Sequence, residues 1–133
     1  ELKARGHESY KIHKTVSRPW GTYTVLEGGS GFKIKRIEVK PGASLSLQLH
    51  HRRTEHWVVV RGTARVTRGD REFDLPAGES TFIPVETRHR LANATTDVLA
   101  LIEVARNLGS AIVAVFHDET ERHKVCTRDI ALA

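Results

Sequence analysis

Residues 42–62, GASLSLQLHHRRTEHWVVVRG, join metal-binding chemistry to a strong strand signal. Potential metal ligands are concentrated within nine positions of this stretch: Gln48, His50, Glu55 and His56. The apolar residues 57–60 follow directly, and a short apolar run of this kind is typical of a buried β-strand. We therefore expect a strand that begins beside a cluster of ligands.

The spacing of Gln48 and His50 suits a site on an extended chain. Alternate side chains of a strand share a face, so these two should point one way and Leu47 and Leu49 the other. Glu55 lies just downstream. Imidazole suits zinc, copper, iron and nickel, and a carboxylate extends the range towards magnesium and manganese. The stretch therefore predicts half of a metal site.

The other half is expected in residues 78–93, GESTFIPVETRHRLAN. His89, Leu91 and Asn93 would share one strand face. A single histidine on a strand is usually an ordinary polar surface residue. Two clusters on strand-like segments favour a site, and His89 could close it with His50 and Glu55.

Composition indicates one soluble globular domain. The chain has 133 residues, of which 39% are hydrophobic and 28% are charged. No apolar run approaches a membrane span, and the first residues lack the apolar core of a secretory signal. Cys126 is the one cysteine, so no internal disulfide can form. We expect a cytoplasmic protein without a membrane partner.

The net charge of +5 and the pI of about 9.7 raise the question of an anionic partner. Nucleic acid is disfavoured because the basic residues are dispersed, aromatics are 6%, and no helical recognition motif is evident. A small anion such as a sugar phosphate fits better, although most of these cations are expected to be ordinary solvated charges. The basic residues nearest the predicted site are Lys33, Lys35, Arg36, Arg52, Arg53, Arg88 and Arg90.

Short apolar segments separated by Gly and Pro turns favour an antiparallel sandwich or barrel. The predicted organisation is an N-terminal arm at 1–18, a barrel at 19–106 and a tail at 107–133 with one more strand and a short helix. A change of phase in FKIKRIEV suggests a bulge near Arg36. Strands are predicted at 22–27, 32–39, 45–50, 55–60, 64–67, 72–75, 81–84, 88–92 and 98–105.

The two clusters resemble the paired motifs of the cupin superfamily. In the first motif Gly42, His50, Glu55 and Gly62 match, with Gln48 at the position of the usual first His. The second motif contains the matching residues Gly78, Pro84, His89 and Asn93, with Glu86 where Gly is usual.

A closer resemblance is to the C-terminal domain of type II mannose-6-phosphate isomerases, often fused behind a mannose-1-phosphate guanylyltransferase. It is carried by RPWGTY, FKIKRIEVKPG, LSLQLHHRRTEHWVVVRGTA, FIP, HRLAN and LIEV and covers roughly residues 2–105. The resemblance implies an all-β cupin-type double-stranded β-helix, a jelly-roll barrel, that holds one divalent metal ion. Zinc is the expected ion, and cobalt, manganese, magnesium and iron are alternatives. The family's ligand set matches Gln48, His50, Glu55 and His89.

The implied activity is metal-dependent interconversion of mannose 6-phosphate and fructose 6-phosphate, which supplies precursors of GDP-mannose and polysaccharides. A proton leaves C2 of the opened sugar, a cis-enediolate forms, and a proton returns to C1. Arg90 and Lys35 are the candidate catalytic cations, and Arg53 and Arg52 are candidates for substrate binding. His56 alternates with Glu55 and is expected to point out of the site.

Two other functions are considered. The tail, LGSAIVAVFHDETER, departs from the family pattern, which favours a catalytically impaired cupin that binds a sugar phosphate or regulates a partner. Two histidines and a carboxylate also form the iron(II) triad of non-heme oxygenases, which His50, Glu55 and His89 could supply. A homodimer through edge strands and a separate or fused guanylyltransferase are the expected partners.

Overall fold

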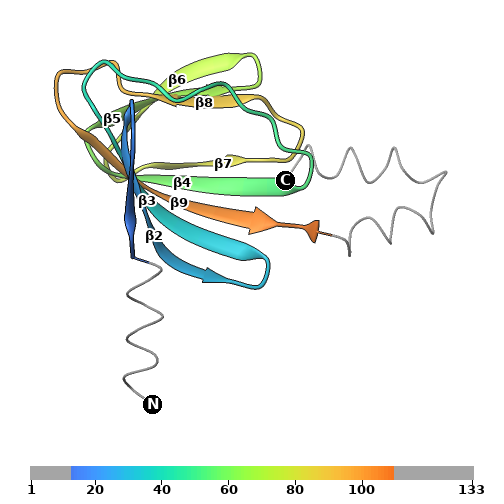
Figure 1. The fold of residues 1–133 in the computed structure, drawn as a ribbon. Coiled ribbons are helices and arrows are strands. Elements are labelled where there is room, and N and C mark those ends of the chain that lie inside the picture. The colour runs from blue at the N-terminus through green and yellow to red at the C-terminus, as the bar shows by residue number, and fades with distance from the viewer. Residues whose placement is uncertain (1–12, 110–133) are drawn as a thin grey trace.

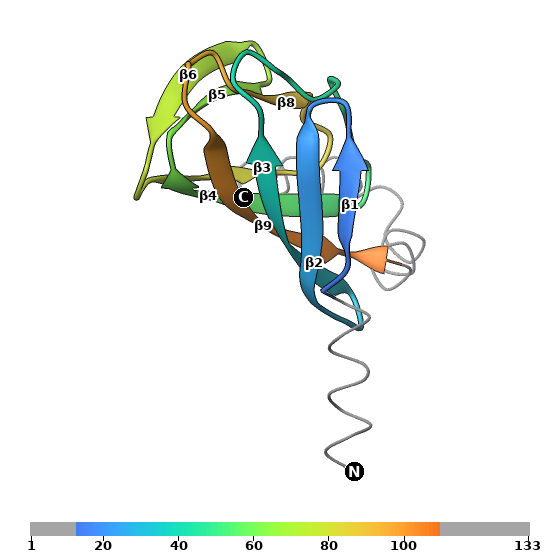
Figure 2. The same cartoon turned by 60° about the vertical axis from the view of Figure 1, so that its left-hand side comes forward.

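The computed structural model describes residues 13–109, which form two antiparallel sheets (Figures 1 and 2). The larger sheet has the order β1-β2-β3-β9-β4-β7, and the smaller has the order β6-β5-β8. The antiparallel all-β architecture predicted from the sequence is confirmed. The strands are β1 (Thr15–Arg18), β2 (Gly21–Gly29), β3 (Phe32–Val39), β4 (Arg53–Arg61), β5 (Thr63–Arg68), β6 (Arg71–Pro76), β7 (Ser80–Ile83), β8 (His89–Ala92) and β9 (Leu99–Asn107).

The core lies between the two sheets and is supplied by alternate residues of the strands. β9 lies in the middle of the larger sheet, between β3 and β4, as its long apolar sequence predicts. No helix of the described residues is long and apolar enough to cross a membrane. The buried core side chains are Ile37, Val39, Trp57, Val59, Ala64, Val66, Leu75, Ile83, Leu91, Leu99 and Leu101.

The segment predicted as a strand at 45–50 does not form a regular strand. It runs along β8 with two isolated bridges, Ser44 to Ala92 and Gln48 to His89. Leu45 is partly buried against the core, whereas Leu47 and Leu49 are 43% and 40% exposed, so the burial of apolar side chains stops after Leu45. The segment therefore lies beside β8 without a continuous series of backbone hydrogen bonds to it.

The bulge predicted near Arg36 is also absent. β3 pairs with β9 in unbroken register from Phe32 to Val39, and the larger sheet's irregularities lie in β2 after Val25 and in β4 after Val59. The change of phase has another cause. The inner face of β3 is apolar at Ile37 and Val39 but carries lysines at its other end.

The last residues of the predicted arm belong to the larger sheet. Residues 15–18, expected in the arm, pair with β2 as strand β1. The strand and helix predicted in the tail lie outside the described residues.

Between β4 and β5, Gly62 has a φ of 84°, and a Cβ there would lie 2.7 Å from the Val98 carbonyl oxygen. Glycine is therefore required at this turn.

Candidate metal centre

Three side chains from separate segments converge inside the barrel: His50, Glu55 and His89. One potential ligand atom of each lies within 4.8 Å of the other two. Oε2 of Glu55 is 3.2 Å from Nε2 of His50 and 3.7 Å from Nε2 of His89. Glu55 lies on β4, His89 begins β8, and His50 lies in the segment that runs beside β8.

Backbone hydrogen bonds hold the two histidine-bearing segments together. The Gln48 and His89 amides each donate to the other residue's carbonyl oxygen at 2.9 Å. The Glu86 amide donates to the His50 carbonyl oxygen at 2.8 Å. Glu86 has a φ of 60°, a left-handed conformation that favours glycine and explains why cupin motifs usually have Gly at this position.

The tautomer of His89 leaves its other ring nitrogen available as a ligand. Nδ1 lies 2.9 Å from the Thr87 carbonyl oxygen, which can only accept, so Nδ1 carries the proton. The buried Nε2 atoms of His50 and His89 have no hydrogen-bond partner in the described part of the chain. Two unpartnered imidazole nitrogens facing a carboxylate are suited to binding a divalent cation. The cluster could therefore hold a metal ion.

Glu55 is 2% exposed and kept ionised by its neighbours. Trp57 Nε1 donates to Oε1 at 2.8 Å, and Arg53 donates to Oε2 through Nε at 3.0 Å and Nη2 at 2.7 Å. Burial opposes ionisation, but the adjacent His89 ring and Glu103 carboxyl and the hydrogen bonds from Arg53 and Trp57 outweigh it and hold the pKa of Glu55 well below its usual range. Glu55 therefore offers a negatively charged ligand at neutral pH.

Glu103 is a site residue that the sequence analysis missed. It lies on β9, in register with Lys35 on one side and Trp57 on the other, and is 6% exposed. Burial and the adjacent Glu55 raise the pKa of Glu103 to about 8, so its carboxyl is protonated at neutral pH. The signal was a lone acid on the buried face of an apolar strand, two residues after Leu101.

The histidine pKa values shift in opposite directions. Burial and the charge of Arg53 lower the pKa of His50. Burial alone would lower the pKa of His89, but the Glu55 carboxylate and the Thr87 carbonyl raise it. His50 is therefore the more readily available neutral ligand, and protons compete more strongly with a metal ion at His89.

The other predicted residues are placed at different distances from the cluster. Gln48 lines a small cavity together with Glu55, His89 and Glu103, so it faces the same interior space. Gln48, Glu103, Lys35 and Arg53 also line a neighbouring cavity of about 320 Å³. The structure thus brings Gln48, Glu55, His89, Lys35 and Arg53 to adjoining cavities, and it places His50 beside Glu55.

Arg52, Arg90 and His56 are less directly connected with the site. Arg52 is exposed immediately before β4, and its carbonyl oxygen accepts a hydrogen bond from the Leu108 amide. Arg90 borders the small cavity, but it is exposed and alternates with the buried His89 on β8. His56 is exposed and lies edge-on to Phe82, which confirms that it points out of the site.

A family model for the C-terminal region of mannose-6-phosphate isomerase matches residues 5–118 of the chain. The chain belongs to this family. The match continues past Ala105, so the expectation that the resemblance ends near that residue is wrong. It overlaps the part of the tail that we expected to depart from the family.

Curated relatives support the assignment. The xanthan biosynthesis protein XanB of Xanthomonas campestris is 48% identical over 120 residues, which are 89% of this chain and 26% of that protein. The alginate biosynthesis protein AlgA of Pseudomonas aeruginosa is 50% identical over 104 residues, which are 78% of this chain and 22% of that protein. The chain therefore spans about a quarter of the length of these relatives.

Solved structures confirm the cupin fold. An RmlC-like cupin from Shewanella frigidimarina has a TM-score of 0.66 at 20% identity, covering 77% of this chain and 90% of that one. A cupin-superfamily sugar phosphate isomerase from Silicibacter pomeroyi has a TM-score of 0.60 at 22% identity, covering 65% and 59% respectively. At these identities the likeness establishes the fold, which is the jelly-roll barrel expected from the sequence motifs.

Proposed function

We propose that this domain is a metal-dependent isomerase that interconverts mannose 6-phosphate and fructose 6-phosphate. The observation that carries the proposal is the pair of unpartnered Nε2 atoms beside Glu55, near a cavity lined by basic side chains. Membership of the mannose-6-phosphate isomerase C-terminal family supports the same substrate class.

His50, Glu55 and His89 would hold the ion, and Gln48 would supply a neutral oxygen ligand from the same cavity. Two imidazoles, a carboxylate and an amide suit zinc, which is the ion we propose. When bound, the ion supplies Lewis-acid stabilisation of the negative charge that develops on the sugar oxygens during isomerisation.

The remaining side chains position the ligands and the sugar. Trp57 and Arg53 fix the Glu55 carboxylate from both of its oxygens. Lys35 faces the larger cavity beside Glu103, where its ammonium would attract a negatively charged sugar phosphate. Trp20 and Tyr23 also line that cavity, and their aromatic surfaces limit the water around a bound sugar.

The proposed biological setting is precursor supply for polysaccharides in the cytoplasm. XanB and AlgA are named for xanthan and alginate biosynthesis, and a Salmonella relative that is 48% identical over 103 residues is named mannose-1-phosphate guanylyltransferase. We propose a guanylyltransferase, fused or separate, as the functional partner. A homodimer is proposed as the assembled state, because edge strands such as β1 and β7 offer pairing surfaces.

The test is interconversion of mannose 6-phosphate and fructose 6-phosphate followed by NMR. The purified chain is stripped with a chelator and then given zinc, cobalt, manganese, magnesium or iron in turn. Turnover restored by a metal is the expected result. One tightly bound ion per chain with no turnover would refute the isomerase proposal and favour the sugar-phosphate-binding cupin. Oxygen uptake that depends on iron would instead favour the oxygenase.

A further inference from the structure

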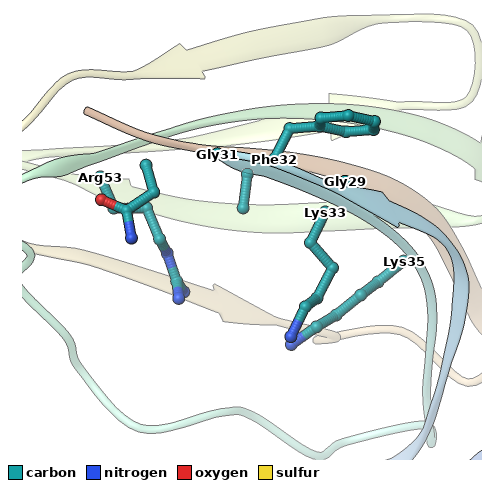
Figure 3. A pocket seen from close by; sticks show the side chains of 8 residues that line it. Gly29, Gly31, Phe32, Lys33, Lys35 and Arg53 are labelled. Atoms are coloured by element: carbon teal, nitrogen blue, oxygen red, sulfur yellow. The ribbon is translucent and has the colours of Figure 1, made fainter. Parts of the chain in front are cut away.

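Three cations gather at the end of the larger sheet where β2 turns into β3. Lys33 and Lys35 of β3 and Arg53 of β4 line a cavity of about 250 Å³. Figure 3 shows the two lysine side chains extending in the same direction from β3, with Arg53 extending to the same side from β4. The cluster of Lys33, Lys35 and Arg53 is called the basic cluster below.

Strand register places the basic cluster next to the proposed metal centre. Lys33 pairs with Ala105 on β9, and Ala105 pairs with Glu55 on β4. Neighbouring strands lie about 4.8 Å apart, so the backbones of Lys33 and Glu55 are about 10 Å apart across the same face. An open six-carbon sugar phosphate can span this separation.

The cavities connect the two places. The cavity of the basic cluster shares Lys35 and Arg53 with the 320 Å³ cavity, and that one shares Gln48 and Glu103 with the small cavity beside Glu55 and His89. A ligand that extends through these adjoining cavities would lie beside Glu55 and His89 at one end and the basic cluster at the other.

The charge of the basic cluster is only partly balanced. Within residues 13–109, neither Lys33 nor Lys35 forms an ion pair with a carboxylate. Arg53 donates to Glu55 through Nε and Nη2 only. Lys33 and Lys35 are neighbours on one strand face, an arrangement that costs stability unless an anion offsets the repulsion.

The residues that line the basic cluster's cavity indicate which kind of anion would bind there. The lining of the basic cluster's cavity contains no acidic residue, whereas both inner cavities include Glu103. Lysine ammonium and arginine guanidinium groups form strong charge-assisted hydrogen bonds with phosphate oxygens. A phosphate monoester, which carries up to two negative charges, suits three cations around one cavity.

We propose that Lys33, Lys35 and Arg53 bind the phosphate group of the sugar phosphate and direct its carbonyl end towards His50, Glu55 and His89. This inference rests on the proposed function for the identity of the sugar. It assigns Lys33 to substrate binding and makes the phosphate the group that orients the sugar in the cavity. Unphosphorylated mannose should therefore bind poorly.

The test measures binding and turnover separately in Lys33→Ala, Lys33→Arg and Arg36→Ala. Arg36 is the matched control because it lies on the same strand, is exposed and faces the opposite side of the sheet. Dissociation constants for mannose 6-phosphate and inorganic phosphate are measured by calorimetry on zinc-loaded protein. Lys33→Ala should weaken both about tenfold, Lys33→Arg should retain most of the affinity, and Arg36→Ala should match the wild type.

Steady-state kinetics provide the second measurement. In Lys33→Ala the KM for mannose 6-phosphate should rise about tenfold while kcat stays within about twofold. If the wild type binds but does not isomerise the sugar phosphate, the proposed function fails, and a loss of phosphate affinity in Lys33→Ala still supports this inference. Wild-type affinity for both ligands in Lys33→Ala, with isomerase activity intact, would overturn this inference alone. No phosphate binding by the wild type would also overturn it.

Discussion

The two ends of the larger sheet's inner face have the same strands but opposite chemistry. At one end Val39 of β3, Leu99 of β9 and Val59 of β4 are at most 1% exposed and form part of the core. At the other end the same three strands present Lys33, the Glu55–Glu103 carboxyl pair and Arg53 to connected cavities. The apolar end supplies the burial that keeps the strands in register, and the polar end uses that register to position charges.

The comparison predicts that substitutions at the two ends affect different measurements. Substitutions at the polar end should reduce metal binding and turnover more than they reduce stability. Substitutions at the apolar end should reduce stability more than they reduce metal binding and turnover. The four predictions below test this separation.

The largest effect is expected for the double variant His50→Ala, His89→Ala. It removes both unpartnered imidazole nitrogens, so bound zinc should be lost. Without the ion, the rate of isomerisation should fall by about 1,000-fold or more, because the ion's stabilisation of negative charge in the transition state amounts to several kcal/mol. Metal content is measured by mass spectrometry and turnover by NMR. His56→Ala, an exposed change on β4, is the control and should retain both. Stoichiometric zinc in the double variant would show that the ion binds elsewhere.

At the apolar end, Leu101→Ala should reduce the free energy of unfolding by about 3 kcal/mol. Leu101 is fully buried, so truncation loses its burial and leaves a cavity. Urea denaturation gives this value. Val104→Ala lies on the outer face of the same strand, where the side chain is 36% exposed, and should cost less than about 1 kcal/mol. A marked fall in zinc affinity of folded Leu101→Ala would contradict the separation of the two ends.

Glu103 should make the stability of the metal-free protein depend on pH. In the folded state its pKa is raised to about 8, whereas the unfolded chain releases this proton near 4.5. The folded state thus binds more protons between these values, and the free energy of unfolding should fall as pH rises across that window, by at most about 1.4 kcal/mol per pH unit. Glu55 has a lowered pKa, so its own contribution falls below pH 4.5.

Denaturation of chelated wild-type and Glu103→Gln protein at several pH values measures this slope. The glutamine keeps a neutral donor beside Glu55 but cannot titrate, so the decline should be smaller in the variant. Identical slopes for the two proteins between pH 5 and about 8 would show that Glu103 does not carry the raised pKa.

Sequence reasoning predicted most of the fold because local alternation and turn residues determine it here. The segment FKIKRIEV was expected as a strand at 32–39, and β3 has these bounds. The strands expected at 64–67 and 72–75 lie within β5 and β6. Residues 45–50 were wrongly assigned to a strand. The alternation of polar and apolar residues does not show whether a segment can form continuous backbone hydrogen bonds with a neighbouring strand.

The site was predicted less completely because its charges depend on contacts between distant strands. His50, Glu55 and His89 were found from motif spacing, and the structure brings them together. Glu103 was read as part of an apolar strand, since its partner Glu55 is close only through the pairing of β4 with β9. The phase change in β3 was read as a bulge, although it reflects lysines that face a cavity.

The smallest predicted effect concerns the hydrogen bond from Trp57 to Glu55. Trp57→Phe keeps an aromatic ring in a site that is 3% exposed but removes the Nε1 donor, which lies 2.8 Å from Oε1. Arg53 still holds Oε2, so Glu55 should stay in place while its orientation loosens. Zinc affinity, measured by competition with a chelator, should fall about tenfold, and saturating zinc should restore turnover. Unchanged zinc affinity would show that Arg53 alone fixes the carboxylate, and a loss of turnover that zinc cannot restore would place Trp57 in contact with the sugar.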